Sequence, residues 1–242
     1  MRTQRGFILD PFRFGGVATD PYFANVSLLI NPAGANTSTT FTDLSANAST
    51  LTAVGNAQHS TARQQFTSSS LLCDGSGDAV TAPSASIFDF GAGAYTLEAW
   101  VYVVSFFSPR VIFSKRAISS SYAPFVLYVD GATNKAAFVS SANGSAWGVD
   151  LVSSSSLSGS TWTHIAVDYD GTTVRLYING VVEASVVASL TVMTNAHAVS
   201  IGAGAANADQ SFDGNIGPAR ITKGVARYAG AFSPPTAAFP TS

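Results

Sequence analysis

The stretch Trp162–Glu183, WTHIAVDYDGTTVRLYINGVVE, decides the fold of this chain. It carries two turn dipeptides, Asp170-Gly171 and Asn179-Gly180, on either side of an alternating run. Asn or Asp followed by Gly tolerates the positive φ angles of a type I′ turn, so each dipeptide predicts a tight β-hairpin. Over residues 173–178, valine, leucine and isoleucine alternate with threonine, arginine and tyrosine. The stretch therefore predicts a three-stranded antiparallel meander with one buried side.

Short strand signals continue on both sides of the meander. The strongest is Tyr95–Val104, where bulky residues on both faces predict a central strand. The other predicted strands and apolar stretches are Asn25–Ile30, Phe41–Leu51, Ser70–Asp74, Ala79–Ala82, Val111–Lys115, Phe125–Val129, Ala136–Ser140, Val199–Gly202 and Ser211–Lys223. So many short strands predict an all-β fold, a two-sheet antiparallel β-sandwich of the jelly-roll kind.

Composition limits the classes of protein to which the chain can belong. Its 242 residues are 46% hydrophobic and 11% charged, with a formal net charge of −2 at pH 7. This length suits one large β-domain, and so weak a net charge favours no polyanionic partner. No apolar run is long enough to cross a bilayer, and the single cysteine, Cys73, excludes an intrachain disulfide and is expected to be buried. We therefore expect no nucleic-acid binding and no membrane insertion.

Residues 1–21 differ from the rest of the chain, because basic and aromatic side chains alternate there and prolines prevent a regular helix. We predict an N-terminal arm over 1–21 for assembly or anchoring, followed by one domain over 22–242. The alternative is that the segment folds back on its own domain as an edge segment. The side chains expected to mediate assembly are Arg5, Phe7, Phe12, Arg13 and Phe14.

The closing stretch Ile216–Pro240, IGPARITKGVARYAGAFSPPTAAFP, carries further motifs. Together with WTHIAV and RLYING of the meander, its RITKGVARY, FSPP and terminal FP resemble the laminin-G-like, concanavalin A-like lectin/glucanase domains of bacteriophage virion proteins and some bacterial surface proteins. The match extends over nearly everything after Tyr22. It implies a concanavalin A-like jelly roll, on which we expect the tail to act as a closing strap that leaves Lys223, Arg227 and Tyr228 available to neighbours.

This resemblance implies a structural accessory protein of a bacteriophage virion, such as a head-decoration protein, tail adaptor or fibre component. The amino terminus, MRTQRGFILDPFRFGG, lacks the apolar run of a signal peptide, so we expect assembly in the host cytoplasm and a location in the virion. The partners would be other virion proteins or copies of this chain. The family also includes glycan binders, so the alternative is a receptor-recognition or adhesion module for host-cell surface polysaccharide.

The sequence predicts a protein without catalytic activity. Hydrolases of this fold use two carboxylates about 5 Å apart. This chain has only two glutamates, Glu98 and Glu183, and neither lies in a carboxylate-rich motif. His164 has no accompanying motif and is expected to be structural.

The resemblance also raises the question of whether the chain binds a structural calcium ion. The family carries paired acids before the last RI, where this chain has Gly217-Pro218. Asp78, Asp89 and Asp213 could still supply oxygens, but a calcium cage needs about six to eight ligands, and turn aspartates usually cap their own loops. We expect no cofactor, with a structural calcium ion as the alternative.

A sugar site needs a stacking aromatic ring beside hydrogen-bonding groups. Two long loops offer both, and the candidate glycan-binding residues are Trp147, Asn143, Tyr122 and Phe107. We place Trp147 first. The alternative is that its ring closes one end of the sandwich as a core residue.

Overall fold

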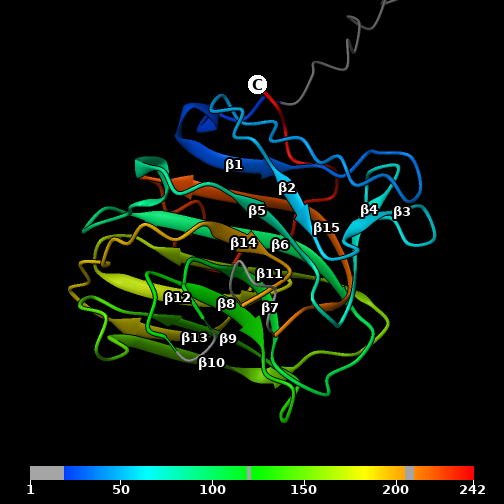
Figure 1. Cartoon of the computed structure of the whole chain (residues 1–242). Coiled ribbons are helices and arrows are strands. Elements are labelled where there is room, and N and C mark those ends of the chain that lie inside the picture. The colour runs from blue at the N-terminus through cyan, green and yellow to red at the C-terminus, as the bar shows by residue number, and fades with distance from the viewer. Residues whose placement is uncertain (1–18, 119–120, 205–209) are drawn as a thin grey trace, which may run out of the picture.

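A computed structural model describes residues 19–118, 121–204 and 210–242. The predicted assembly residues Arg5, Phe7, Phe12, Arg13 and Phe14 lie outside these ranges. Within them, two antiparallel sheets stack on each other (Figure 1).

The larger sheet, sheet A, has eight strands in the order β13-β12-β11-β6-β15-β4-β3, and β1 pairs with β15. The second, sheet B, has seven strands in the order β10-β9-β8-β7-β14-β5-β2. In sheet A the strands are β1 (Val26–Ile30), β3 (Gln58–Ser60), β4 (Ser70–Asp74), β6 (Tyr95–Val103), β11 (Trp162–Tyr169), β12 (Thr173–Ile178), β13 (Val181–Val187) and β15 (Asp213–Lys223). Those of sheet B are β2 (Thr52–Val54), β5 (Ala79–Ala82), β7 (Arg110–Ser114), β8 (Val126–Val129), β9 (Lys135–Ser140), β10 (Val149–Ser156) and β14 (Val199–Ile201). Two 3₁₀ turns are η1 (Phe23–Asn25) and η2 (Ser86–Phe88).

The predicted meander is confirmed as β11, β12 and β13, and β6 is central between β11 and β15. The two hairpin turns differ, however. Asn179 and Gly180 have φ of 49° and 79°, as a type I′ turn requires. In the other turn only Gly171 has a positive φ, and the Asp170 carboxylate holds the loop by accepting hydrogen bonds from the backbone N–H groups of Thr172 and Thr173.

The apolar stretch Phe41–Leu51 forms no strand. Its backbone is held by a side chain instead, because the Asp43 carboxylate accepts hydrogen bonds from the N–H groups of Leu29 and Ser49 at 3.0 and 2.9 Å. The strands β2, β3 and β10 were not predicted. In β10 the half that follows Leu151 is mostly serine, which gives little apolar signal.

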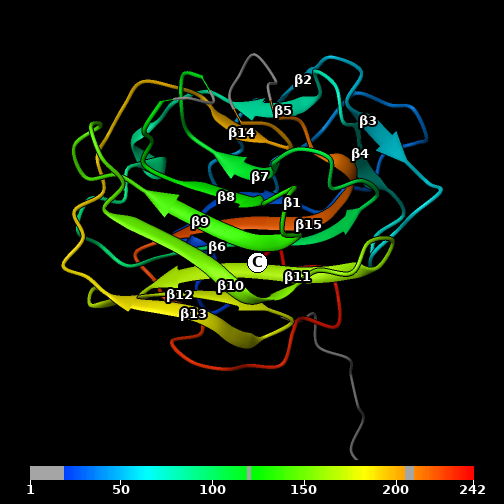
Figure 2. The ribbon, with the colours of Figure 1, turned by 90° about the horizontal axis from the view of Figure 1, so that it is seen from below.

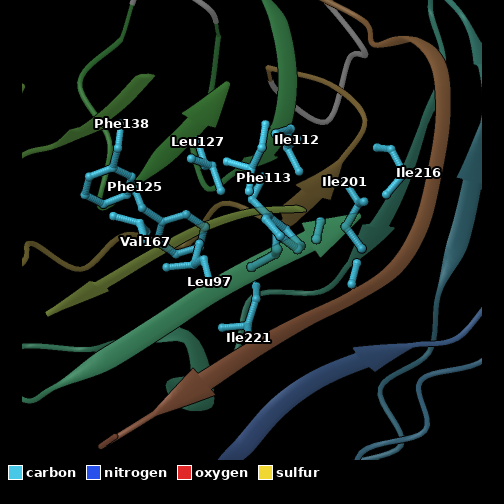
Figure 3. Packing of buried hydrophobic residues seen from close by; sticks show 14 of the residues in the cluster. Leu97, Ile112, Phe113, Phe125, Leu127, Phe138, Val167, Ile201, Ile216 and Ile221 are labelled. Atoms are coloured by element: carbon cyan, nitrogen blue, oxygen red, sulfur yellow. The ribbon is translucent and has the colours of Figure 1, made fainter. Parts of the chain in front are cut away.

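The core fills the space between the sheets. Leu97 and Val167 of sheet A face Phe138 of sheet B and Phe125, which directly precedes β8 (Figure 3), and all four are fully buried. At one side the sandwich is closed by β10 and β13, which lie side by side (Figure 2). There the carboxylate of Glu183 accepts a 2.8 Å hydrogen bond from the N–H of Ser155, which joins the two sheets.

Residues 224–242, the strap, contribute aromatic rings to the outer face of sheet A. Phe232 stacks on Tyr228 with ring centroids 3.4 Å apart, and both rings meet Tyr177 edge to face. The Phe232 N–H also donates to the Gly180 carbonyl at 2.9 Å. Tyr177 is therefore buried, and the prediction that only one side of β12 is buried is wrong. The alternation within one strand cannot predict that a later segment of the chain covers its outer side.

The expectation that Arg227 and Tyr228 remain available to neighbours is also wrong. Lys223 is half-buried and donates to a backbone carbonyl in η2 at 2.7 Å through an exposed hydrogen bond, so it remains accessible. Arg227 pairs with Asp20 at 2.8 Å, and the Tyr228 hydroxyl donates to Glu98. Asp20 also donates its N–H to the terminal Ser242 carbonyl, so the start of the described chain lies beside its C terminus (Figure 1).

Candidate functional site

A groove of about 260 Å³ lies on the outer face of sheet B. It follows from the pleat of two strands, in which Leu127 and Phe138 point into the core while Tyr128 and Val139 belong to a separate outer cluster. The groove is lined by Pro109, Arg116, Val126, Tyr128, Asp130, Val139, Trp147, Asp150 and Gln210. It joins an apolar floor to several charged and hydrogen-bonding groups.

Trp147 and Tyr122 come together beside this groove, as the glycan-binding prediction requires. Their ring centroids are 4.9 Å apart at 68°, an edge-to-face contact. Tyr122 is 38% exposed, and Trp147 is half-buried against the outer cluster rather than in the main core. Trp147 therefore does not act as a core plug between the sheets.

Asn143 shapes the loop that carries Trp147. Its Oδ1 accepts hydrogen bonds from the N–H groups of Ser145 and Ala146 at 3.0 and 3.2 Å. The Ser141 hydroxyl closes the same loop by donating to the Ala146 carbonyl at 2.6 Å. Asn143 is absent from the groove lining, so the structure assigns it to loop geometry.

Phe107 is 94% exposed on the connection between β6 and β7. It does not line the groove, although Pro109 of the same connection does. The structure therefore joins Trp147 with Tyr122 and leaves Phe107 outside their contact.

The polar groups of the groove were missed in the sequence. Burial raises the pKa of Tyr128, and the nearby Asp150 and Asp130 carboxylates raise it further, so its hydroxyl stays protonated. Hydrogen bonds from Thr133 lower the pKa of Asp130, which remains ionised. Arg116 donates to the Gln210 side chain. A signal existed in β8 and β10, where a polar side chain alternates with buried aliphatic ones.

A second cluster of charged groups lies under the strap and is buried. Glu98 accepts hydrogen bonds from Arg220 at 2.7 and 2.9 Å and from the Tyr228 hydroxyl, and its Oε2 lies 3.2 Å from His164 Nε2. Burial opposes ionisation of Glu98, but Arg220, His164 and Tyr228 outweigh it and lower the pKa to about 2. This cluster fastens the strap to sheet A, which explains the RITKGVARY motif.

Two of the aspartates considered for calcium, Asp78 and Asp213, are engaged by neighbouring groups of the protein. Asp78 accepts backbone hydrogen bonds from Asn56 and Asp74, both at 2.8 Å, and Asp213 lies 3.6 Å from Arg110. Within the described residues, no group of three or more His, Cys, Asp or Glu is placed to hold a metal ion. Nor do these residues include a helix long and apolar enough to span a membrane.

Residues 74–227 match the family model Laminin_G_3, described as the concanavalin A-like lectin/glucanases superfamily. No curated protein matches the chain in sequence.

Solved structures share the fold. The binding domain of Paraclostridial Mosquitocidal Protein 1 has a TM-score of 0.64 at 14% identity, covering 85% of this chain and 50% of that one. The receptor-binding domain of botulinum neurotoxin C/D mosaic serotype has a TM-score of 0.63 at 15% identity, covering 84% and 49%. A structure of botulinum neurotoxin type C has a TM-score of 0.60 at 13% identity, covering 85% of this chain and 49% of that one. Cell entry of that toxin is described as dependent upon interaction with two ganglioside molecules. This chain thus spans about half the length of the solved chains that it matches.

Proposed function

Because the chain belongs to the concanavalin A-like lectin/glucanases superfamily, we propose that it is a carbohydrate-binding module that holds host surface polysaccharide in the sheet B groove. The observation that carries this proposal is the Trp147–Tyr122 pair, which sits beside a groove with charged groups. Support for a cell-surface glycan as the ligand class comes from two of the similar structures, one described as a receptor-binding domain and one of a neurotoxin whose cell entry is described as dependent on two ganglioside molecules.

The groove supplies the contacts that a sugar requires. The apolar face of a sugar ring packs on the Trp147 indole, while its hydroxyls meet the Asp150 carboxylate and the Tyr128 hydroxyl. Asp150 is exposed, so it exchanges water for a sugar hydroxyl at little cost. A volume of about 260 Å³ is smaller than the ~300–1,000 Å³ of drug-sized pockets. It suits one sugar residue of a longer chain.

We propose binding without hydrolysis. Glu98 is buried under the strap, and Glu183 is bonded to β10, so neither glutamate of the chain lines the groove. Asp130 is engaged by its own turn through Thr133. Incubation with β-glucans should release no reducing sugar, and turnover that survives further purification would contradict this part of the proposal.

The setting that we propose for this module is a bacteriophage virion, assembled in the host cytoplasm from copies of this chain or other virion proteins. Support comes from the resemblance of residues 162–183 and 216–240 to domains of such proteins, and from the basic and aromatic composition of residues 1–21. Mass spectrometry of purified particles should find the protein at a stoichiometric copy number. Its absence from the particles would refute this setting and leave the glycan proposal standing.

The glycan proposal is tested with a panel of bacterial surface polysaccharides and immobilised full-length protein. We expect saturable binding to at least one of them, lost in Trp147→Ala and weakened in Tyr122→Ala. Trp162→Ala is the matched control, because Trp162 is a half-buried tryptophan of sheet A that meets Tyr102 edge to face and lies outside the groove. Unchanged binding by a folded Trp147→Ala variant would refute the assignment of the site.

A further inference from the structure

Lys115 is a fully buried lysine at the end of β7, outside the groove. A lysine side chain is rarely buried without a specific reason, because its ammonium group loses hydration. Here its Nζ contacts two connections distant in the chain, one containing Asn195 and one containing Ser84 and Asp89. The Lys115 side chain is therefore buried, but it reaches a polar cluster at the surface, where Ser84 is exposed and the Asp89 side chain is 30% exposed.

The reactive groups of an amide exchange are already close together in this cluster. Lys115 Nζ lies 2.9 Å from Asn195 Oδ1. Since a carbonyl bond is about 1.2 Å long, the Asn195 Cγ lies within about 4 Å of the amine. Reacting atoms in near-attack arrangements are about 3–3.5 Å apart, so a displacement on the order of 1 Å brings the nitrogen onto the carbon.

The Asn195 carboxamide is also held and polarised. Its Oδ1 accepts a second hydrogen bond from the His197 backbone N–H at 3.1 Å. This oxygen is the atom on which negative charge develops when the carbonyl is attacked. Its Nδ2 donates to the Lys115 carbonyl at 3.0 Å, which fixes the orientation of the amide. The side chain has therefore lost the freedom to rotate away from the amine.

Asp89 supplies a base beside the amine. Its Oδ1 lies 3.7 Å from Lys115 Nζ and is a buried atom without a hydrogen-bond partner among the described residues. Burial lowers the pKa of Lys115, with the Asp89 charge acting in the opposite direction. Burial thus shifts the amine toward its neutral, nucleophilic form, and the Asp89 carboxylate lies beside it.

We propose that Lys115 and Asn195 form an intramolecular isopeptide bond, promoted by Asp89. Once Nζ has lost its ammonium proton to solvent, its lone pair attacks Asn195 Cγ and the C–Nδ2 bond breaks. Asp89 carries one of the two remaining Nζ protons to Nδ2, which leaves as ammonia, and the new amide keeps the other as its N–H. One amide replaces another, so the reaction needs no oxidant, reductant or further reactant. The bond ties the end of β7 to the connection between β13 and β14. The two residues that it joins are 80 positions apart along the chain.

The test is the intact mass of the purified full-length chain. The wild-type mass should be lower than the sequence mass by one ammonia molecule. Tandem mass spectrometry of a tryptic digest should find the peptide that contains Lys115 joined to the peptide that contains Asn195. Lys115→Met, Asn195→Ala and Asp89→Asn should keep their full calculated masses.

Lys135→Met is the matched control, because Lys135 lies on β9 away from the cluster and its replacement should leave the ammonia loss intact. A wild-type chain at its full sequence mass after long incubation would overturn the proposal. Loss of ammonia that persists in Lys115→Met would overturn it equally, because the loss would then come from an asparagine elsewhere, such as one preceding glycine. The wild-type mass decides the matter even if a variant fails to fold.

Discussion

Replacing Arg220 with methionine should remove a large fraction of the stability of the fold at neutral pH. Arg220 is 5% exposed and donates two hydrogen bonds to Glu98 and one to Asp20, all between 2.7 and 2.9 Å. Methionine fills similar space without charge. Glu98, which is 0% exposed, then keeps Tyr228, His164 and the more distant Arg227, whose Nε lies 3.9 Å from Glu98 Oε1.

The expected loss follows from two routes. Removing one partner of a buried ion pair costs about 3–5 kcal/mol, because the other charge stays buried. A Glu98 pKa of about 2 against the usual value of 4.5 corresponds to roughly 3 kcal/mol of stability at neutral pH, of which Arg220 contributes the largest share and His164 and Tyr228 the rest. Since small domains are stable by only about 5–15 kcal/mol, the loss is a large fraction of the total.

The pH dependence adds a second signature. The lowered pKa of Glu98 means that its stabilisation is complete above the unfolded value near 4.5 and is lost as the pH falls toward 2. Arg220 is the largest influence that lowers the pKa of Glu98, so its removal should raise this pKa, and protonation on acidification should relieve part of the cost in the variant. The stability difference between the wild type and Arg220→Met should therefore shrink on acidification.

Guanidinium unfolding followed by tryptophan fluorescence measures both effects. Arg175→Met is the matched control, because Arg175 pairs with the partly exposed Asp170 at 2.7 Å and lies farther, at 3.7 Å, from the buried Asp168, so its loss should cost less than the loss of Arg220. Equal losses for the two variants, or a difference that grows at acidic pH, would refute this account of the buried network.

Two further outcomes follow from packing. In Gly180→Ala the new Cβ would lie 1.9 Å from the Phe232 carbonyl oxygen, whereas Gly171, also at positive φ, has nothing within 4 Å of such an atom. Thermal unfolding should therefore show Gly180→Ala destabilised by about 1–3 kcal/mol more than Gly171→Ala, and equal midpoints would contradict the role of the strap. Burial, aided by Asp78 and Asp74, raises the pKa of the Cys73 thiol well above its usual value. Iodoacetamide at about pH 8 should thus label Cys73 only after unfolding, and rapid labelling of the native chain would show that the thiol is accessible.

Much of the fold could be predicted because its signals are local. The turn at Asn179-Gly180 and the strand β6, which carries bulky residues on both faces, are each indicated by a pattern of a few consecutive residues. The structure contains both. The pairing of Asp20 with Arg220 bridges 200 positions of sequence, so no local pattern indicates it. The same reason explains why Tyr177 was expected to face solvent.

The candidate site was predicted in part. Trp147 and Tyr122 were found because a sugar site needs aromatic rings, and the loops that carry them meet in the fold. Asn143 was chosen for its amide, but a side chain that caps its own loop cannot be distinguished by sequence from one that faces a ligand. Tyr128 and Asp150 lie on different strands, and only sheet pairing places them in one groove.

The most direct measurement of the central claim is an amide and indole NMR titration of the ¹⁵N-labelled chain with the oligosaccharide that binds best in the panel. Binding in the sheet B groove predicts saturable shifts centred on the Trp147 indole N–H and on the backbone amides of Tyr128 and Asp150. Shifts confined to sheet A and the strap, or no saturable shift with any sugar tested, would contradict it.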